Sequence, residues 1–429
     1  MASFWLFRAA VAFLTVLGVA DLYFYNYARI HALFQQTPSI RFNLYGDPQI
    51  EGDAKLQREP RTGKFDIIIN DYYLHYVYGS TIAAFKPNYV ITMGDIFSSQ
   101  WVKQGEYDKR IERFKWISQR VDGRNNTIRS NHTNMYMAGN HDVGYGYETR
   151  AYHIRRFEDN FGPLNRKWTV DIDGRTHRMV ILNAMNLDKT RMRQYRVDAW
   201  DFVHQLVADI ADQPDMPLIL FLHIPFHKPD GVCVTSAKTE YRDGFVRYQD
   251  YLSPTTSAYL LHCLSPVLVF NGHDHNGCVA GHSVHAPAGN PLKLGDSGKV
   301  LQSGSDMCNL TLEELDLYQP EIQEFALSTM SSMTGHAAGA STSLSTIEVT
   351  VRSCMGAYHG ATGIFDISRN HQQQTTFDVR VLGHSVQASI GGYTYKYQEI
   401  LLGHHLVVRV LLVANLVSCF VVSVMFLPR

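Results

Sequence analysis

Short runs of β-branched and aromatic residues recur from residue 40 to about 280, and each run ends in Gly, Asn, Asp or His. The runs are IRFNLYGD, YVITMGD, NMYMAGNHD, MVILNAMN, LILFLHIP and VLVFNGHDH. Short apolar runs bounded by turn residues predict buried strands. Between them, Tyr107–Val121 and Val197–Ile210 carry apolar residues at helical spacing. This alternation predicts an α/β layered domain whose polar residues lie beyond the carboxyl ends of the strands.

After residue 280 the periodicity weakens, but the stretches TIEVTVRSCMGAYHGATGIFDI and TTFDVRVLGH predict further strands. No fixed-period repeat or linker divides this part of the chain. We therefore expect one domain over residues 40–400.

The N-terminal residues 1–27 predict a membrane-targeting segment. Arg8 precedes an apolar run, Ala9–Ala20, and four aromatic residues follow it. So short a run, with small residues before Asp21, also fits a cleaved signal peptide. A span from Phe4 to Tyr25 instead approaches the ~20 residues that cross a bilayer, with tyrosines at the interface. We favour the uncleaved anchor.

The C-terminal stretch Val410–Leu427 is apolar enough to cross a bilayer, with Arg409 placed to snorkel, so we expect a transmembrane helix over residues 406–427. Between the ends lie three N-x-[ST] sequons, at Asn125, Asn131 and Asn309. A targeting segment, a C-terminal span and sequons together predict a glycosylated lumenal domain with both termini cytosolic.

The composition, with 45% hydrophobic residues and a formal net charge of -1, shows no electrostatic bias towards nucleic acid. Five of the six cysteines lie outside the C-terminal span. Because five is odd, at least one thiol stays free or pairs between chains. In an oxidising lumen we expect one or two disulfides.

Five polar clusters follow the predicted strands in order. Each is weak alone, but their succession at strand ends predicts a metal site. The clusters are Asp47-Pro48-Gln49, Gly94-Asp95, Gly139-Asn140-His141-Asp142, His223 and Gly272-His273-Asp274-His275.

Carboxylates bind hard divalent ions, and added imidazole and amide donors favour Mn, Fe or Zn over Mg or Ca. Two ions close together need a bridging carboxylate, for which the central Asp95 is suited. Asp47 and His275 would complete one metal. The residues that would complete the other are Asn140, His223 and His273. Two metals sharing a hydroxide would provide a nucleophile near neutral pH.

The series D-x-[H/Q], G-D, G-N-H-D, H and G-H-x-H resembles the calcineurin-like metallophosphoesterase superfamily, which implies a β-sandwich flanked by helices. The details GDPQI, GDIF, GNHDVGYG, RFEDNFG, HIPFHKP and FNGHDHNGC resemble a narrower branch. That branch comprises endoplasmic-reticulum phosphodiesterases that remove ethanolamine phosphate from the mannoses of GPI anchors. The motif match is dense over residues 43–162 and 218–278.

The resemblance implies the same metal ligands and makes His141 the residue that contacts the phosphate and protonates the leaving oxygen. Asp142 would orient or tune His141. Tyr145 and His227 lie in the motif loops and would line the substrate pocket, although a place on its rim explains them as well. Gln49 stands where many members have histidine. An amide binds metal more weakly than an imidazole does, so Gln49 is either a weak metal ligand or a residue that contacts the ligands and not the metal.

Cys233 and Cys278 lie on loops that leave neighbouring ligand strands, so a disulfide between them would brace the site. The alternative is two unpaired buried thiols.

We therefore expect a membrane-anchored lumenal phosphodiesterase with two divalent metals, Mn²⁺ foremost, acting on GPI-anchored proteins in the endoplasmic reticulum. The C-terminal FLPR lacks a dilysine-type retrieval signal, so this location rests on the resemblance and the spans. The alternatives are a lumenal phosphoesterase acting on lipids or nucleotides and a non-catalytic GPI-protein sorting factor. The intact His141 and Asp95 favour an enzyme over a sorting factor.

Overall fold

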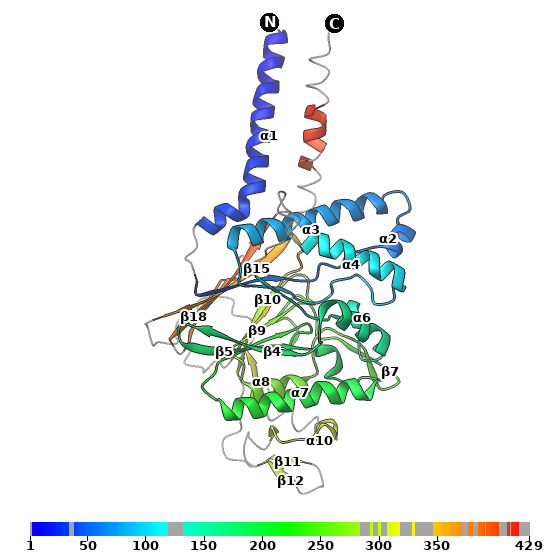
Figure 1. Ribbon diagram of the computed structural model, residues 1–429, viewed down its shortest axis with the longest axis vertical. Helices are drawn as coiled ribbons and strands as arrows, with labels where there is room; N and C mark the ends of the chain where they lie inside the picture. The colour runs from blue at the N-terminus through cyan, green and yellow to red at the C-terminus, as the bar shows by residue number, and fades with distance from the viewer. Residues whose placement is uncertain are drawn as a thin grey trace.

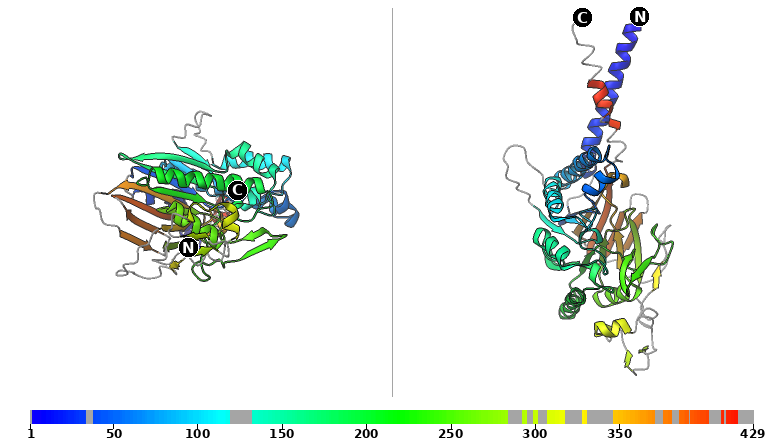
Figure 2. Two further views of the ribbon diagram at one scale, coloured as in Figure 1. Left: turned by 90° about the horizontal axis from the view of Figure 1, so that it is seen from below. Right: turned by 90° about the vertical axis from the view of Figure 1, so that its right-hand side faces the viewer.

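Two seven-stranded sheets lie face to face, and helices cover both outer faces (Figures 1 and 2). The computed structural model describes residues 2–33, 38–118, 132–283, 292–294, 299–301, 307–317, 328–330, 346–370, 376–380, 385–390, 392–402, 410–411 and 413–419. The predicted sandwich with flanking helices is thereby confirmed.

The first sheet has the order β16-β17-β18-β15-β1-β2-β3. β1, β2 and β3 are parallel, whereas β15 pairs antiparallel with β1. Its strands are β1 (Ile40–Tyr45), β2 (Tyr89–Thr92), β3 (Thr133–Tyr136), β15 (Ala361–Arg369), β16 (Thr376–Arg380), β17 (Ser385–Ile390) and β18 (Tyr393–Leu401). Of the strands expected after residue 280, β15 and β16 lie in this sheet, and β14 (Thr346–Thr350) lies in the second sheet.

The second sheet has the order β13-β10-β14-β9-β6-β5-β4, and its centre, β14-β9-β6-β5, is parallel. Its strands are β4 (Arg166–Ile172), β5 (Arg175–Leu182), β6 (Leu218–Leu222), β9 (Leu268–Asn271), β10 (Cys278–Ser283), β13 (Ser328–Met330) and β14 (Thr346–Thr350). Two small hairpins are β7 (Thr239–Arg242) with β8 (Phe245–Gln249), and β11 (Leu292–Leu294) with β12 (Lys299–Leu301).

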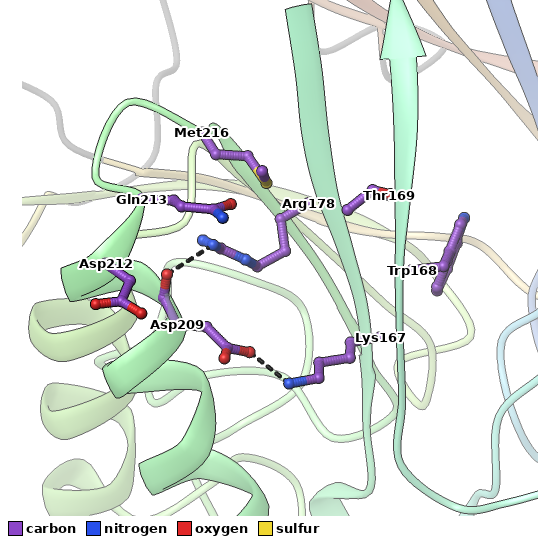
Figure 3. Close-up of a pocket in the computed structure, with 8 residues that line it drawn as sticks. All are labelled: Lys167, Trp168, Thr169, Arg178, Asp209, Asp212, Gln213 and Met216. Carbon is purple, nitrogen blue, oxygen red and sulfur yellow. Dashed lines mark hydrogen bonds and ion pairs between the residues drawn. The ribbon is translucent and has the colours of Figure 1, made fainter.

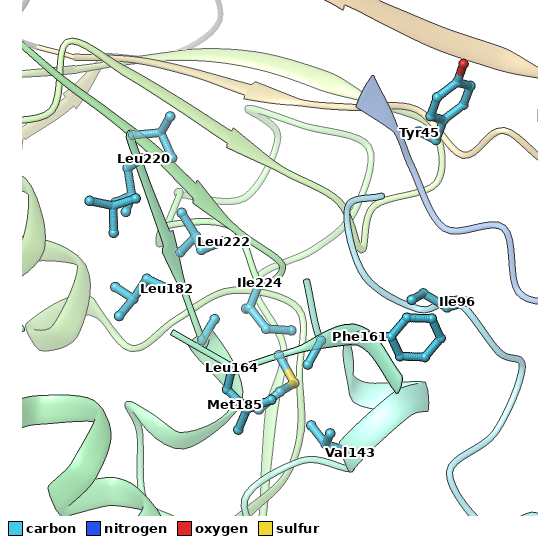
Figure 4. Packing of buried hydrophobic residues seen from close by; sticks show 14 of the residues in the cluster. Tyr45, Ile96, Val143, Phe161, Leu164, Leu182, Met185, Leu220, Leu222 and Ile224 are labelled. Atoms are coloured by element: carbon cyan, nitrogen blue, oxygen red, sulfur yellow. The ribbon is translucent and has the colours of Figure 1, made fainter. Parts of the chain in front are cut away.

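The continuous apolar run of β6 reflects burial on both of its faces. Ile219 and Phe221 pack between the sheets, where they share a core cluster with Phe42 of β1. Leu220 and Leu222 point the other way, into the cluster beneath the helices, part of which Figure 4 shows. Both outer layers are therefore packed onto the sheets that carry the polar strand ends.

The helices are α1 (Ala2–Leu33), α2 (Asp53–Arg58), α3 (Gly63–Phe85), α4 (Gln104–Ser118), α5 (Asn140–Val143), α6 (Ala151–Phe161), α7 (Arg193–Asp212), α8 (Pro254–Leu264) and α10 (Leu312–Leu317). α4 and α7 confirm the two helices expected from periodicity, and Ile111 and Phe114 of α4 are buried as their spacing indicated. α3 was not expected, because its many aromatic and β-branched residues show no clear helical stripe.

α1 and the C-terminal helical residues project together from one end of the domain (Figure 1). In the described part of the chain, no single helix has both the length and the apolar character needed to cross a bilayer. Two segments of α1, Val11–Tyr23 and Asn26–Leu33, meet that requirement only as a pair bent by 58°. The two terminal spans stay predictions, and most of residues 406–427 lies outside the described residues.

Candidate metal centre

The predicted donors follow the carboxyl ends of β1, β2, β3, β6 and β9, and these ends meet on one side of the sandwich. Asp47 and Asp95 are each only 1% exposed. The loops after β1 and β2 are hydrogen-bonded to each other, because the backbone N–H of Gln49 donates to the backbone carbonyl of Asp95 at 2.9 Å. The fold thus brings together residues that lie up to 228 positions apart in the sequence, from Asp47 to His275.

Glycines before the donors are required by close approach as well as by turn geometry. Gly94 has φ +92°, and a Cβ placed on it would overlap the His223 ring. A Cβ on Gly139 would overlap the Asp95 carboxylate. At both places only glycine lets the loop lie against the neighbouring donor.

One group of donors gathers around Asp95, His223 and His273, whose ligand atoms all lie within 4.8 Å of one another. The Nε2 atom of His223 is 3.4 Å from Oδ1 of Asp95 and 3.2 Å from Oδ1 of Asn140. These are the residues expected for one metal, with Asp95 as the bridging ligand.

The two imidazoles of this group face it through opposite nitrogens. Nδ1 of His223 donates to the Met93 carbonyl at 2.8 Å, which leaves Nε2 turned to the donors. Nε2 of His273 donates to the Gln249 carbonyl at 3.0 Å, which leaves its Nδ1 for the site. Backbone carbonyls that fix a tautomer in this way are the usual support of metal-binding histidines.

The second group consists of Asp47, His275 and Gln49. Nε2 of His275 is 3.2 Å from Oδ2 of Asp47. The Gln49 side-chain amide reaches both groups, with Nε2 3.2 Å from Nε2 of His275 and 3.3 Å from Oδ2 of Asp95. Gln49 therefore lies among the donors, between the two groups.

The buried carboxylates of the site favour the binding of cations. Burial alone would raise the pKa of Asp95, but the imidazoles of His223 and His141 hold it well below its usual range. Burial alone would lower the pKa of His223, yet Asp95 and Asp47 raise it to about 9. Within the described residues, the ion pairs of Asp47 and Asp95 all come from imidazoles. Buried carboxylates that draw protons onto histidines are a donor set that fits divalent cations.

His141 stands at the rim of this site. Its backbone amide donates to Oδ1 of Asp95 at 2.8 Å, and its Nε2 lies 3.9 Å from Oδ2 of the same carboxylate. The side chain is 38% exposed, unlike the buried donors. A substrate bound at the donors can therefore reach it.

Asp142 was expected to orient or tune His141, but its carboxylate is directed elsewhere. It accepts hydrogen bonds from the backbone amides of Gly139, Ile96 and Phe97. Burial, then the nearby Asp95, raises its pKa to about 7, while the three amides oppose that rise. The Asp142 carboxylate therefore links the loop after β3 to the loop after β2. These hydrogen bonds position His141 through the backbone.

Of the two expected pocket residues, only Tyr145 is placed against a donor. Its ring lies 6.2 Å from the His273 ring, edge to face, and it is buried. His227 is half-buried, and its backbone amide donates to Oγ of Ser257. The contacts described for His227 do not bring it to the donors.

The expected disulfide Cys233–Cys278 is present, and a second one, Cys263–Cys308, joins α8 to the segment before α10. Cys354 is free and buried, which accounts for the odd number of cysteines outside the C-terminal span. Of the three sequons, Asn309 is described and exposed, whereas Asn125 and Asn131 lie outside the described residues.

A buried ion pair behind the site had no signal in the sequence. Glu348 of β14 lies 2.8 Å from Nζ of Lys228 and accepts hydrogen bonds from His282, Asn271 and the Phe226 amide. Lys228 and Glu348 are 120 positions apart, so only the fold reveals the pair.

A cavity of about 320 Å³ lies between β4, β5 and the end of α7 (Figure 3). None of its lining residues is a predicted site residue. Lys167 and Arg178, its cationic residues, are already engaged by the Asp209 carboxylate and carbonyl. We therefore do not place the site there.

No family model matches the chain. Protein TED1 of Saccharomyces cerevisiae is 27% identical over 58% of this chain and 66% of its own length. Metallophosphoesterase 1 of Xenopus laevis is 25% identical over 55% of this chain and 62% of its own. The chain thus spans less than two thirds of these relatives. A dimetal phosphatase from Danio rerio covers 86% of this chain and 99% of its own at 9% identity, but its TM-score of 0.41 adds nothing to the assignment.

The order of donor motifs along the chain and these relatives identify a calcineurin-like metallophosphoesterase. The resemblance seen in the motifs is confirmed, and the relatives that the chain is similar to include TED1 and Metallophosphoesterase 1 proteins.

Proposed function

We propose that this chain is a phosphodiesterase dependent on two divalent metal ions, Mn²⁺ foremost. It removes ethanolamine phosphate from mannose on GPI-anchored proteins, in the lumen of the endoplasmic reticulum and anchored to its membrane. The observation that carries the chemistry is that Asp47 and Asp95 are buried among imidazoles, with Asn140 and Gln49 supplying further donors. The substrate and the location are supported by the motif resemblance.

Two divalent metals held by these donors would, when bound, make a water molecule acidic enough to act as the nucleophile and would offset the charge on the phosphate. Asp95 bridges the two donor groups, and the Asp142 contacts keep His141 at the rim. Water attacks phosphorus and the bond from phosphorus to the mannose oxygen breaks. His141 gives the leaving oxygen a proton, because a sugar alkoxide is a poor leaving group.

The test uses the full chain purified in detergent with Mn²⁺. Release of phosphoethanolamine from a mannose-linked diester is compared with hydrolysis of bis-nitrophenyl phosphate. Asp95→Asn should lose bound metal and at least about 100-fold of the rate on both substrates. Asp212→Asn, an exposed control on α7, should keep both. If the metal-loaded wild type hydrolysed neither substrate, the proposed phosphodiesterase activity would be refuted. Hydrolysis of the nitrophenyl ester alone would refute the proposed GPI substrate.

The role of His141 has its own signature. His141→Ala should slow the mannose-linked reaction by about 10²–10⁴-fold, because the sugar oxygen needs a proton. Nitrophenolate leaves without one, so the nitrophenyl rate should fall much less. Equal losses on the two substrates would contradict proton donation by His141.

A further inference from the structure

Helix α3 presents an exposed apolar face at the end of the domain that carries α1. Phe65, Ile68 and Tyr72 are 57%, 45% and 65% exposed, and their spacing puts them on one side of the helix. Trp116 of α4 extends this face, with its ring 5.0 Å from that of Tyr72. We call Phe65, Ile68, Tyr72 and Trp116 the α3 patch. Apolar side chains grouped in this way mark an interaction surface rather than scattered exposure.

The α3 patch lies on a helix that α1 contacts. Four residues beyond Tyr72, the same side of α3 reaches Tyr76, which is partly buried. Tyr76 packs against the core cluster that contains Ala28, and Tyr27 at the foot of α1 packs against the same cluster. Figure 1 shows α3 running across the end of the domain from which α1 projects. The α3 patch therefore lies on a helix at the end of the domain from which α1 projects (Figure 1).

α1 exposes apolar side chains along its free length, for example Val16 at 68% and Leu22 at 68%. The C-terminal helical residues beside it do the same, with Leu416 at 61%. The two segments touch through Nδ2 of Asn415, which donates to Oδ1 of Asp21 at 3.3 Å. Apolar side chains exposed along projecting helices favour an apolar environment.

We propose that the α3 patch docks on the surface of the phospholipid bilayer that holds α1, an inference that rests on the membrane anchor of the proposed function. Because α1 contacts α3 at this end of the domain (Figure 1), a bilayer that surrounds α1 would lie close to the exposed apolar residues of α3. Tyrosine and tryptophan are suited to this interface, since their rings are apolar and their polar atoms reach water. This second attachment fixes the orientation of the domain, so that the metal centre keeps one height above the membrane in which a lipid-anchored substrate is held.

The experiment measures lipid contact at single nitroxide labels on the full chain in phosphatidylcholine vesicles. The background is Cys419→Ser, with the buried Cys354 retained. Labels are placed at Ile68→Cys and Tyr72→Cys in the α3 patch. The matched control is Leu317→Cys on α10, 69% exposed and at the opposite end of the domain. A label at Val16→Cys reports on the anchor.

Collisions with oxygen, which concentrates in lipid, are compared with collisions with a water-soluble nickel chelate. We expect a raised ratio of oxygen to nickel collisions at both α3 labels relative to the α10 label. Ratios at the α3 patch equal to that of α10, with a high ratio at Val16→Cys, would overturn the docking and leave the anchor in place. A low ratio at Val16→Cys as well would overturn both.

Discussion

Replacing Lys228 by methionine tests how much the buried Lys228–Glu348 ion pair, which lies behind the metal centre, contributes to stability. Nζ of Lys228 lies 2.8 Å from Oε2 of Glu348, and the two side chains are 1% and 0% exposed. Glu348 also binds the Phe226 amide in the loop after β6 and Nδ2 of Asn271 at the end of β9. Lys228→Met keeps most of the side-chain volume but leaves the carboxylate without its lysine.

The size of the effect follows from burial. Burial would raise the pKa of Glu348, but Lys228 and His282 lower it from 4.5 to about 2. The ionised carboxylate therefore stabilises the fold above pH 4.5, and this contribution is lost as the pH falls from 4.5 to about 2. A shift of that size corresponds to ~3 kcal/mol. Removing one partner of a buried pair costs about 3–5 kcal/mol, so we expect that loss of unfolding free energy for Lys228→Met near neutral pH.

The assay is urea unfolding of the full chain in detergent, followed by tryptophan fluorescence. Lys115→Met is the control, because Lys115 pairs with Glu112 at 51% and 73% exposure and the pair should contribute at most about 1 kcal/mol. Adding Glu348→Gln to Lys228→Met removes the charge that Lys228 balanced and keeps an acceptor for the Phe226 backbone amide, so the double variant should be more stable than the single one. A cost no greater than that of the control, or a double variant no more stable than Lys228→Met, would refute the reasoning.

Two further predictions concern the donors and their bracing. Gln49→His should increase the Mn²⁺ retained after dialysis, since imidazole binds more strongly than an amide; unchanged metal content would speak against Gln49 as a ligand. The disulfides Cys233–Cys278 and Cys263–Cys308 each close 45 positions, so replacing either pair by serine should cost a similar ~4 kcal/mol. Metal retention should fall only without Cys233–Cys278, which braces loops beside the donors; equal losses of metal would contradict that bracing role.

The positions of the donors were predictable because parallel strands end at one edge of a sheet, so residues that follow successive strands of one sheet lie near one another. This groups Asp95 with the donors after β1 and β3 of the first sheet, whereas His223 follows β6 of the second sheet, and the face-to-face packing of the two sheets brings it to Asp95. The partner of Lys228 could not be predicted, because a contact across 120 positions has no local pattern. α3 was missed for another reason: packing of Tyr73 and Val77 onto the core outweighs the strand preference of its residues.

The backbone is strained at several of the donors, including Gln49. Asp47, Gln49, Asp95 and His273 have φ of 38°, 41°, 49° and 70°, in the left-handed region. Such a residue costs on the order of 1–3 kcal/mol, which the surrounding fold must offset. Asp and His accept this conformation more readily than most residues, whereas Gln has no such advantage. The contacts of the Gln49 side chain to His275 and Asp95 place its amide among the donors, where the surrounding fold offsets that strain.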